Sequence, residues 1–211
     1  MNKIKAIETE YKGYLFRSRL EARWAVFFDA CGVDWDYEEE AYSLGEGLNY
    51  LPDFVLHNAY LTNSGKYEDV YVEVKGVMND KDAEKIKRFA MAGNRILVVG
   101  KIPDGSDCMA IIQYVNEAGK KRGKPEWPAE FNSETLNGIS CPVLMGITYF
   151  GMFSFFAVDD KNIELYNEMD GYKEPSSLLA LGYWETYAAY KRAKQARLEN
   201  RHLDNLYRSI A

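Results

Sequence analysis

The residues Tyr71-Val72-Glu73-Val74-Lys75 place valines at every second position, a pattern typical of a β-strand. Residues two apart on a strand project from the same face, so the two valines face a core while Glu73 and Lys75 share the other face. A carboxylate and an amine in this arrangement often serve only as partners for neighbouring strands. At roughly 6–7 Å apart, they are also close enough for one metal ion or water to lie between their ends.

Periodicity on both sides of this strand predicts an α/β fold. The predicted helices cover Arg17–Cys31 and Asp80–Met91, and the predicted strands cover Lys12–Phe16, Val33–Tyr37, Tyr50–His57, Val70–Gly76 and Arg95–Val99. Elements in this order are expected to form a mixed β-sheet flanked by helices. We assign this sheet to a core of residues 1–118, with residues 119–211 as a C-terminal extension of strands and a long helix packed on the core.

In the extension, the pattern is weaker. Cys108–Tyr114, just before it, is a candidate strand, and Ser177–Tyr207 is a candidate long helix. The basic stretch of residues 190–197 is either a basic tail or the solvated face of this helix, which would then pack through Trp184, Tyr187 and Leu198.

The uncharged run of residues 139–158 is long enough to cross a membrane as a helix. However, Pro142, Gly146 and Gly151 interrupt it, its aromatic residues lie in the middle, and its flanks carry no positive excess. We therefore expect two buried strands on either side of Gly151 and no membrane span.

Charge is unevenly distributed in a chain whose formal net charge is -6. This total argues against a protein that coats nucleic acid, but an enzyme that acts on nucleic acid needs only a local basic track. Basic residues gather between Lys81 and Lys101 and again between Lys191 and Arg201, whereas acidic residues gather between Asp34 and Glu46. Each basic cluster is either such a track or the solvated face of a helix.

The cysteines Cys31, Cys108 and Cys141 are widely spaced and form no CxxC pair. This pattern argues against disulfides and a structural zinc site, and it favours a reducing cytoplasm. His57 and His202 are lone histidines, which we expect to be structural or exposed rather than metal ligands.

A second carboxylate, Asp53, follows Pro52 at the beginning of a predicted strand. Pro-Asp pairs commonly form turns. If this strand pairs antiparallel with the strand of Glu73, however, the two carboxylates lie side by side and repel unless a cation lies between them. Ligands that are all oxygen suit Mg²⁺, which binds few side chains and keeps several waters.

Glu21 is a third candidate, with two competing roles. Ser18 and Glu21 match a capping box, in which each side chain caps a backbone amide at the beginning of a helix. Alternatively, the Glu21 carboxylate points from the first helical turn towards a metal ion, directly or through water.

Five ordered pieces of the chain resemble the PD-(D/E)xK nuclease superfamily, in particular small resolvase-like and phage-encoded nucleases. The pieces are FRSRLE at residues 16–21, GVDW at 32–35, YE at 37–38, YLPDF at 50–54 and VEVKG at 72–76. They fall between residues 11 and 99, under half of the chain. The resemblance implies a restriction-endonuclease-like fold.

The resemblance also implies a role for each site residue. Asp53 and Glu73, with the carbonyl of Val74, would hold Mg²⁺, for which Mn²⁺ could substitute. Lys75 would position or activate the attacking water, and Glu21 would help with a metal. The candidate phosphate contacts, which could equally be ordinary surface charges, are Arg17, Arg19, Lys85 and Lys87.

We therefore expect an Mg²⁺-dependent DNA endonuclease that acts by one-step hydrolysis without a covalent intermediate. DNA is the expected partner, a membrane is not, and we allow for a homodimer. The alternative is a catalytically idle nuclease-fold module that binds DNA or a protein. The presence of all three of Asp53, Glu73 and Lys75 favours the enzyme, since a binding module does not need them together.

Overall fold

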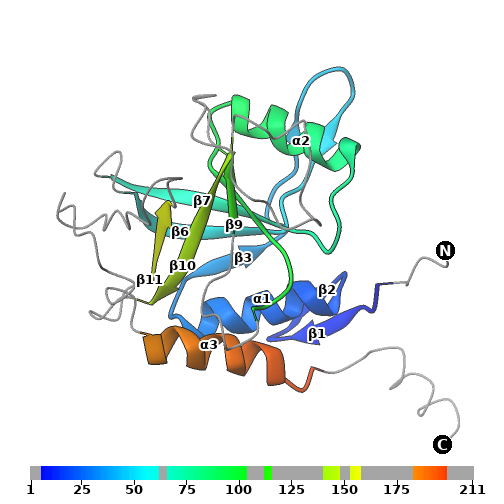
Figure 1. Ribbon diagram of the computed structural model, residues 1–211. Coiled ribbons are helices and arrows are strands. Elements are labelled where there is room, and N and C mark those ends of the chain that lie inside the picture. The colour runs from blue at the N-terminus through cyan, green and yellow to red at the C-terminus, as the bar shows by residue number, and fades with distance from the viewer. Residues whose placement is uncertain are drawn as a thin grey trace, which may run out of the picture.

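The computed structural model describes residues 6–61, 66–103, 112–115, 140–147, 153–157 and 183–198. These residues form three layers. A mixed β-sheet lies between helix α2 (Asp80–Met91) on one face and helices α1 (Arg19–Ala30) and α3 (Tyr183–Gln195) on the other (Figure 1). The expected α/β class, with a mixed sheet covered by helices, is confirmed.

Seven of the described strands form one sheet, in the order β11-β10-β9-β8-β7-β6-β3. Their bounds are β3 Trp35–Tyr37, β6 Phe54–Leu61, β7 Lys66–Val74, β8 Ile96–Val99, β9 Ile112–Val115, β10 Ser140–Ile147 and β11 Phe153–Ala157. The other described strands form two short hairpins, β1 (Thr9–Tyr11) with β2 (Tyr14–Phe16) and β4 (Tyr42–Ser43) with β5 (Asn49–Tyr50). Strands β10 and β11 thus continue the sheet that the first half of the chain begins.

Strand β7 lies between an antiparallel neighbour, β6, and a parallel neighbour, β8. Helix α2 connects the two parallel strands. Phe54 pairs with Val72 across β6 and β7, so the next position in the same register sets Asp53 across from Glu73. The antiparallel pairing on which the proximity of Asp53 and Glu73 depends is therefore confirmed.

The alternating residues of β7 separate onto the two faces of the sheet as expected. Val72 and Val74 lie in the hydrophobic cluster that contains Trp24 and Phe28 of α1. Tyr71 packs against the second cluster, which α2 covers. Because successive side chains on a strand point to opposite faces, Glu73 belongs to the same side as Tyr71.

The prediction of one continuous strand over Tyr50–His57 is wrong. Tyr50 ends β5, and β6 begins only after Asp53. Pro52 between them has no N–H to donate to a neighbouring strand. The carbonyl of Asp53 accepts a hydrogen bond from the backbone N–H of Glu38 (3.0 Å). This interruption places Asp53 immediately before the first residue of β6, beside the end of β7.

The uncharged run of residues 139–158 contains two strands, as predicted. Strands β10 and β11 pair antiparallel, with Val143 opposite Ala157 and Ile147 opposite Phe153. The residues that connect them lie outside the described part of the chain. Of the helices that the structure describes, none is both long enough and apolar enough to cross a membrane.

Helix α3 lies within the predicted range Ser177–Tyr207, but the prediction that the helix continues past Gln195 is wrong, since residues 196–198 are not helical. The positions 177–182 and 199–207 lie outside the described residues. It packs on α1, and the ring of Tyr190 stacks on that of Phe27 with 4.4 Å between centroids. The expectation that Trp184 helps to bury the helix is wrong, since its side chain is 73% exposed. The residues that form the buried face instead include Ala189, Tyr190 and Ala193.

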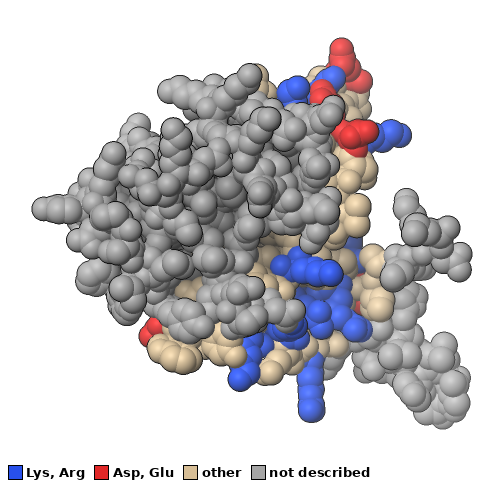
Figure 2. Space-filling model, viewed as in Figure 1, with Lys and Arg blue, Asp and Glu red and all other residues tan. Residues whose placement is uncertain are grey.

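Charged side chains also divide the surface. In Figure 2, Lys and Arg side chains gather over the region where α1 and α3 lie, with few acidic side chains among them. Acidic and basic side chains alternate at the opposite end of the molecule, near α2. The uneven charge seen along the sequence is therefore also uneven in space.

Candidate active site

The two predicted metal ligands, Asp53 and Glu73, are both buried, at 3% and 4% exposure. Burial, followed by repulsion from Glu73 and Glu21, raises the pKa of Asp53 well above its usual value, against opposing effects of the Val74 N–H and Lys75. The predicted carboxylates and Lys75 therefore interact within one charged cluster. The folded chain covers both carboxylates.

The two oxygens of Asp53 have different kinds of partner. Oδ2 accepts a hydrogen bond from the backbone N–H of Val74 at 2.7 Å. Oδ1 accepts one from Nη2 of Arg17 at 2.8 Å. The first donor is fixed in the backbone at the end of β7, whereas the second is at the tip of a long side chain that is 58% exposed.

The two carboxylate oxygens of Glu73 also have different kinds of partner. Its Oε2 accepts a hydrogen bond from the hydroxyl of Tyr50 at 2.6 Å, and this contact is buried. Its Oε1 lies 2.6 Å from Nζ of Lys75, whose side chain is 23% exposed. Asp82, in the first turn of α2, lies 3.7 Å from the same Nζ. Each carboxylate thus has one oxygen held by a neutral donor and the other by a cationic side chain.

Lys75 remains a cation in this setting. Burial by itself lowers the pKa of Lys75, but the nearby carboxylates, Glu73 foremost, outweigh burial and raise it. A lysine that holds its proton this firmly suits electrostatic stabilisation and the positioning of water better than removal of a proton from it.

Glu21 lies at the beginning of α1 and is also buried. Its Oε1 accepts a hydrogen bond from the Ser18 hydroxyl (2.6 Å), and Ser18 Oγ accepts one from the Glu21 N–H (3.2 Å). Its Oε2 accepts from the Tyr37 hydroxyl (2.6 Å) and from the backbone N–H of Arg17 (3.1 Å). The capping role is therefore present in altered form, since Glu21 reaches the amide of Arg17 rather than that of Ser18.

The candidate phosphate contacts are not brought together in one place. Arg17 pairs with Asp53 and with Glu38 Oε1, the latter at 2.5 Å. Arg19 lies in the first turn of α1 and is partly buried. Lys85 and Lys87 lie on α2, across the sheet from α1 (Figure 1).

Three members of the site were not predicted: Tyr37, Glu38 and Tyr50. Glu38 adopts a left-handed backbone conformation (φ 48°), which is uncommon outside glycine. Burial raises the pKa of Glu38, Arg17 lowers it, and Glu21 and Glu73 raise it further. In the sequence, all three stood within pieces of the family resemblance, at 37–38 and 50–54, but no role was assigned to them. The roles of the two tyrosines depend on where each hydroxyl lies in the fold.

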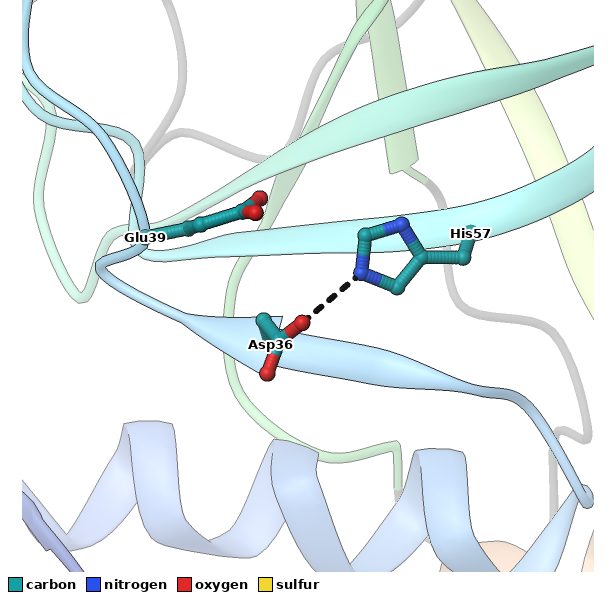
Figure 3. Close-up of side chains that lie close together, drawn as sticks. All are labelled: Asp36, Glu39 and His57. Carbon is teal, nitrogen blue, oxygen red and sulfur yellow. Dashed lines mark hydrogen bonds and ion pairs between the residues drawn. The ribbon is translucent and has the colours of Figure 1, made fainter.

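A second group of potential ligands lies elsewhere. Potential ligand atoms of Asp36, Glu39 and His57 lie within 4.8 Å of one another (Figure 3). Among the described residues, this is the group of three or more His, Cys, Asp or Glu side chains that meets this spacing. His57 Nε2 is 2.9 Å from Asp36 Oδ2, and its Nδ1 is 3.6 Å from Asp69 Oδ1. His57 therefore connects strands β3, β6 and β7, in agreement with the expected structural role.

Comparisons of the chain with known protein families, curated protein sequences and solved structures found no match.

Proposed function

We propose that this protein is a divalent-metal-dependent nuclease that hydrolyses phosphodiester bonds of DNA. The observation that supports this proposal is the shared arrangement of Asp53 and Glu73. In each, a neutral donor orients one oxygen while a removable cation occupies the other. Side chains arranged only for stability do not require two buried carboxylates across from each other at the ends of paired strands.

We also propose the restriction-endonuclease-like fold and the division at residue 118. The order of elements supports the first: a helix, an antiparallel strand pair, a crossover helix and a parallel strand. The packing of α3 on α1 is consistent with an extension that covers a core.

The donors of the cluster fit Mg²⁺, with Mn²⁺ as a substitute. Mg²⁺ is typically held by one or two carboxylates with waters completing its shell, and Asp53 and Glu73 supply that number. Such an ion would lower the pKa of a bound water and polarise a phosphoryl oxygen. Glu21 is held at the beginning of α1, where it adds negative charge beside Asp53. Val74 touches the cluster through its N–H, and its carbonyl remains a proposed ligand.

The other groups orient these ligands and counter charge. The Val74 N–H and the Tyr50 hydroxyl fix the inner oxygens of Asp53 and Glu73, so the outer oxygens have defined positions. The ammonium of Lys75 lies at the outer oxygen of Glu73, where it would stabilise negative charge on a phosphoryl group and hold water. Arg17 and a divalent ion would compete for the outer oxygen of Asp53, so Arg17 must move for the ion to bind there.

The proposal can be tested with the full chain and four DNA substrates: supercoiled plasmid, linear duplex, branched duplex and single strands. We expect cleavage of at least one substrate with Mn²⁺ or Mg²⁺ and none with EDTA. Asp53→Asn and Lys75→Met should lose this activity, whereas Asp80→Asn, an exposed carboxylate of α2, should retain it. Equal cleavage by all variants would reveal a contaminant and overturn the proposal.

A specific observation favours the alternative, a catalytically idle DNA- or protein-binding module. The outer oxygens of Asp53 and Glu73 are already paired with Arg17 and Lys75, so each of these two carboxylates has a cationic partner without an ion. Thermal melting separates the two functions. A melting temperature that Mn²⁺ raises in the parent but not in Asp53→Asn supports the nuclease, and one that Mn²⁺ leaves unchanged in both supports the idle module.

A further inference from the structure

The face formed by α1 and α3 is basic, although the chain as a whole carries a net charge of -6 (Figure 2). Its cations come from three separate parts of the sequence: the first half of α1, the residues after β8, and the second half of α3 with the residues just after it. They are Arg19, Arg23, Lys101, Lys191, Arg192, Lys194 and Arg197. We call this set the α1–α3 basic face.

The packing of α3 fixes the direction of its basic residues. Tyr190 and Ala193 are buried against α1 and the sheet, and the Tyr190 hydroxyl donates a hydrogen bond to the carbonyl of Met145 at 3.0 Å. Lys191 and Arg192 are consequently exposed. Because Tyr190 and Ala193 are used in this packing, the outward face of the second half of α3 carries mainly polar and charged side chains, with the exposed Trp184 near the beginning of the helix.

The remaining cations are tied to the same face by contacts with α1. The fully buried Trp24 donates a hydrogen bond from its indole N–H to the carbonyl of Gly100, at 2.7 Å. This contact holds the exposed Lys101 next to α1. Arg23 precedes Trp24 in the helix, and its Nε is buried without a hydrogen-bond partner in the described structure, as is that of Arg19.

Several basic residues outside this face are neutralised, although Lys81, Lys85 and Lys87 of α2 are in no ion pair of the described residues. Lys12, Arg17, Lys75 and Arg88 each pair with a carboxylate at 2.9 Å or less. In the described parts of the chain, no such ion pair involves Arg19, Arg23 or Lys101. The face therefore has positive charge available to an external polyanion.

The face also adjoins the candidate active site. Figure 1 shows α1 and α3 side by side, with the C-terminal end of α3 towards the side where α1 begins. Glu21 and Arg17, at the beginning of α1, belong to the charged cluster. A chain of phosphates that follows the basic face would thus reach the carboxylates.

We propose that the α1–α3 basic face binds the phosphate backbone of the DNA and leads it to the candidate active site. This inference rests on the proposed nuclease function for its choice of polyanion. Contacts of this kind are largely independent of sequence and depend strongly on salt, because each neutralised phosphate releases condensed counterions. The helix α2 cluster of Lys81, Lys85 and Lys87, across the sheet, is predicted to contribute less.

The test compares two triple variants with the same change in charge. One is Lys191→Gln, Arg192→Gln and Arg197→Gln on the basic face, and the other is Lys81→Gln, Lys85→Gln and Lys87→Gln on α2. Binding of a fluorescent 30-base-pair duplex is measured by anisotropy in EDTA, over a range of salt concentrations. Substitutions at surface positions typically change stability by less than about 0.5 kcal/mol. Melting curves would verify this for all six positions, of which Lys85 and Lys87 are partly buried.

We expect the basic-face variant to bind roughly tenfold to several hundredfold more weakly at low salt. Each lost phosphate contact should also make the slope of log K against log salt shallower by about 0.9. The α2 variant should weaken binding much less. Equal weakening by both variants, or by neither, would overturn the inference, as would a parent that does not bind DNA at low salt. Binding of the parent to phosphatidylserine vesicles, in place of DNA, would assign the face to lipid and also overturn it.

The inference and the proposed function can fail separately. If the parent cleaves DNA and the basic-face variant binds like the parent, the inference is wrong and the nuclease proposal stands. If DNA binding depends on the basic face but no metal supports cleavage by the parent, the nuclease proposal is wrong and the inference stands.

Discussion

Replacing Lys75 by Met should reduce both stability and cleavage, but under different conditions. Methionine retains most of the unbranched side chain, so packing beside β7 should change little. The substitution removes the ammonium that lies 2.6 Å from Oε1 of Glu73, whose side chain is 6% exposed. The buried carboxylate then keeps its bond to Tyr50 but loses its nearest positive charge.

The expected loss of stability without metal follows from this contact. A hydrogen bond to a charged group contributes about 1.5–3 kcal/mol. With an unfolding entropy of about 2.1 cal/mol/K per residue and 211 residues, this loss corresponds to roughly 3–7 °C in melting temperature. With Mn²⁺ present the loss should shrink, because the ion would neutralise the same oxygen. Cleavage should fall by roughly 10²–10⁴ at saturating metal, since a positioned charged group has been removed.

Melting curves in EDTA and in Mn²⁺, with cleavage rates on one DNA, provide the measurement. Lys81→Met, on the exposed side of α2, is the matched control and should be unchanged in all three. If Lys75→Met melts like the parent in EDTA, the ion pair adds nothing to the fold. If it cleaves as fast as the parent, Lys75 is only a charge on a strand face and the proposed mechanism is wrong.

Three further predictions follow. Asp53→Asn should raise the melting temperature in EDTA at neutral pH and abolish the Mn²⁺-induced rise. Because the pKa of Asp53 is raised in the folded chain, stability falls as pH rises and this carboxyl ionises. A lower melting temperature in EDTA would contradict this. Glu21→Gln should cost less than about 1.5 kcal/mol in a denaturant titration and reduce cleavage at least tenfold, and retained cleavage would leave Glu21 as a helix cap only. Burial lowers the pKa of His57, but Asp36, Asp69 and Glu39 outweigh burial and raise this pKa above the usual 6.5. Stability should therefore decline as pH rises through the raised pKa. A His57→Gln variant with the same pH profile would show that His57 is not the group responsible.

Local patterns were sufficient to predict the helices and the pairing that carries the site. The predicted bounds of α2 are the observed ones, since Asn79 accepts a hydrogen bond from the N–H of Asp82 as an N-cap and apolar residues recur on one face. The alternation around Glu73 specified which side chains enter the core. The proximity of Asp53 and Glu73 then required only that two consecutive strands pair antiparallel, the simplest connection available.

The partners of these carboxylates could not be predicted in the same way. Tyr50 and Tyr37 meet their carboxylates from separate strands, across 23 and 16 positions of the sequence. Arg17 was expected to be either a phosphate contact or an ordinary surface charge, yet its guanidinium pairs with both Asp53 and Glu38. Periodicity reports which face a side chain occupies, but it does not report what approaches that face from another element.

The charges at the site are the strongest physical argument for the proposal that this cluster binds a cation. Four carboxylates, Glu21, Glu38, Asp53 and Glu73, interact with one another and face two cations, Arg17 and Lys75. Formally, two negative charges remain in a region that water reaches poorly. Burial, followed by repulsion from Glu73 and Glu21, raises the pKa of Asp53 there. Like charges held together at low exposure destabilise a fold, and apolar residues of similar size would avoid that cost. One divalent ion would neutralise the remainder. A function that requires the negative charge, such as binding a divalent ion, therefore explains the cluster better than a contribution to stability does.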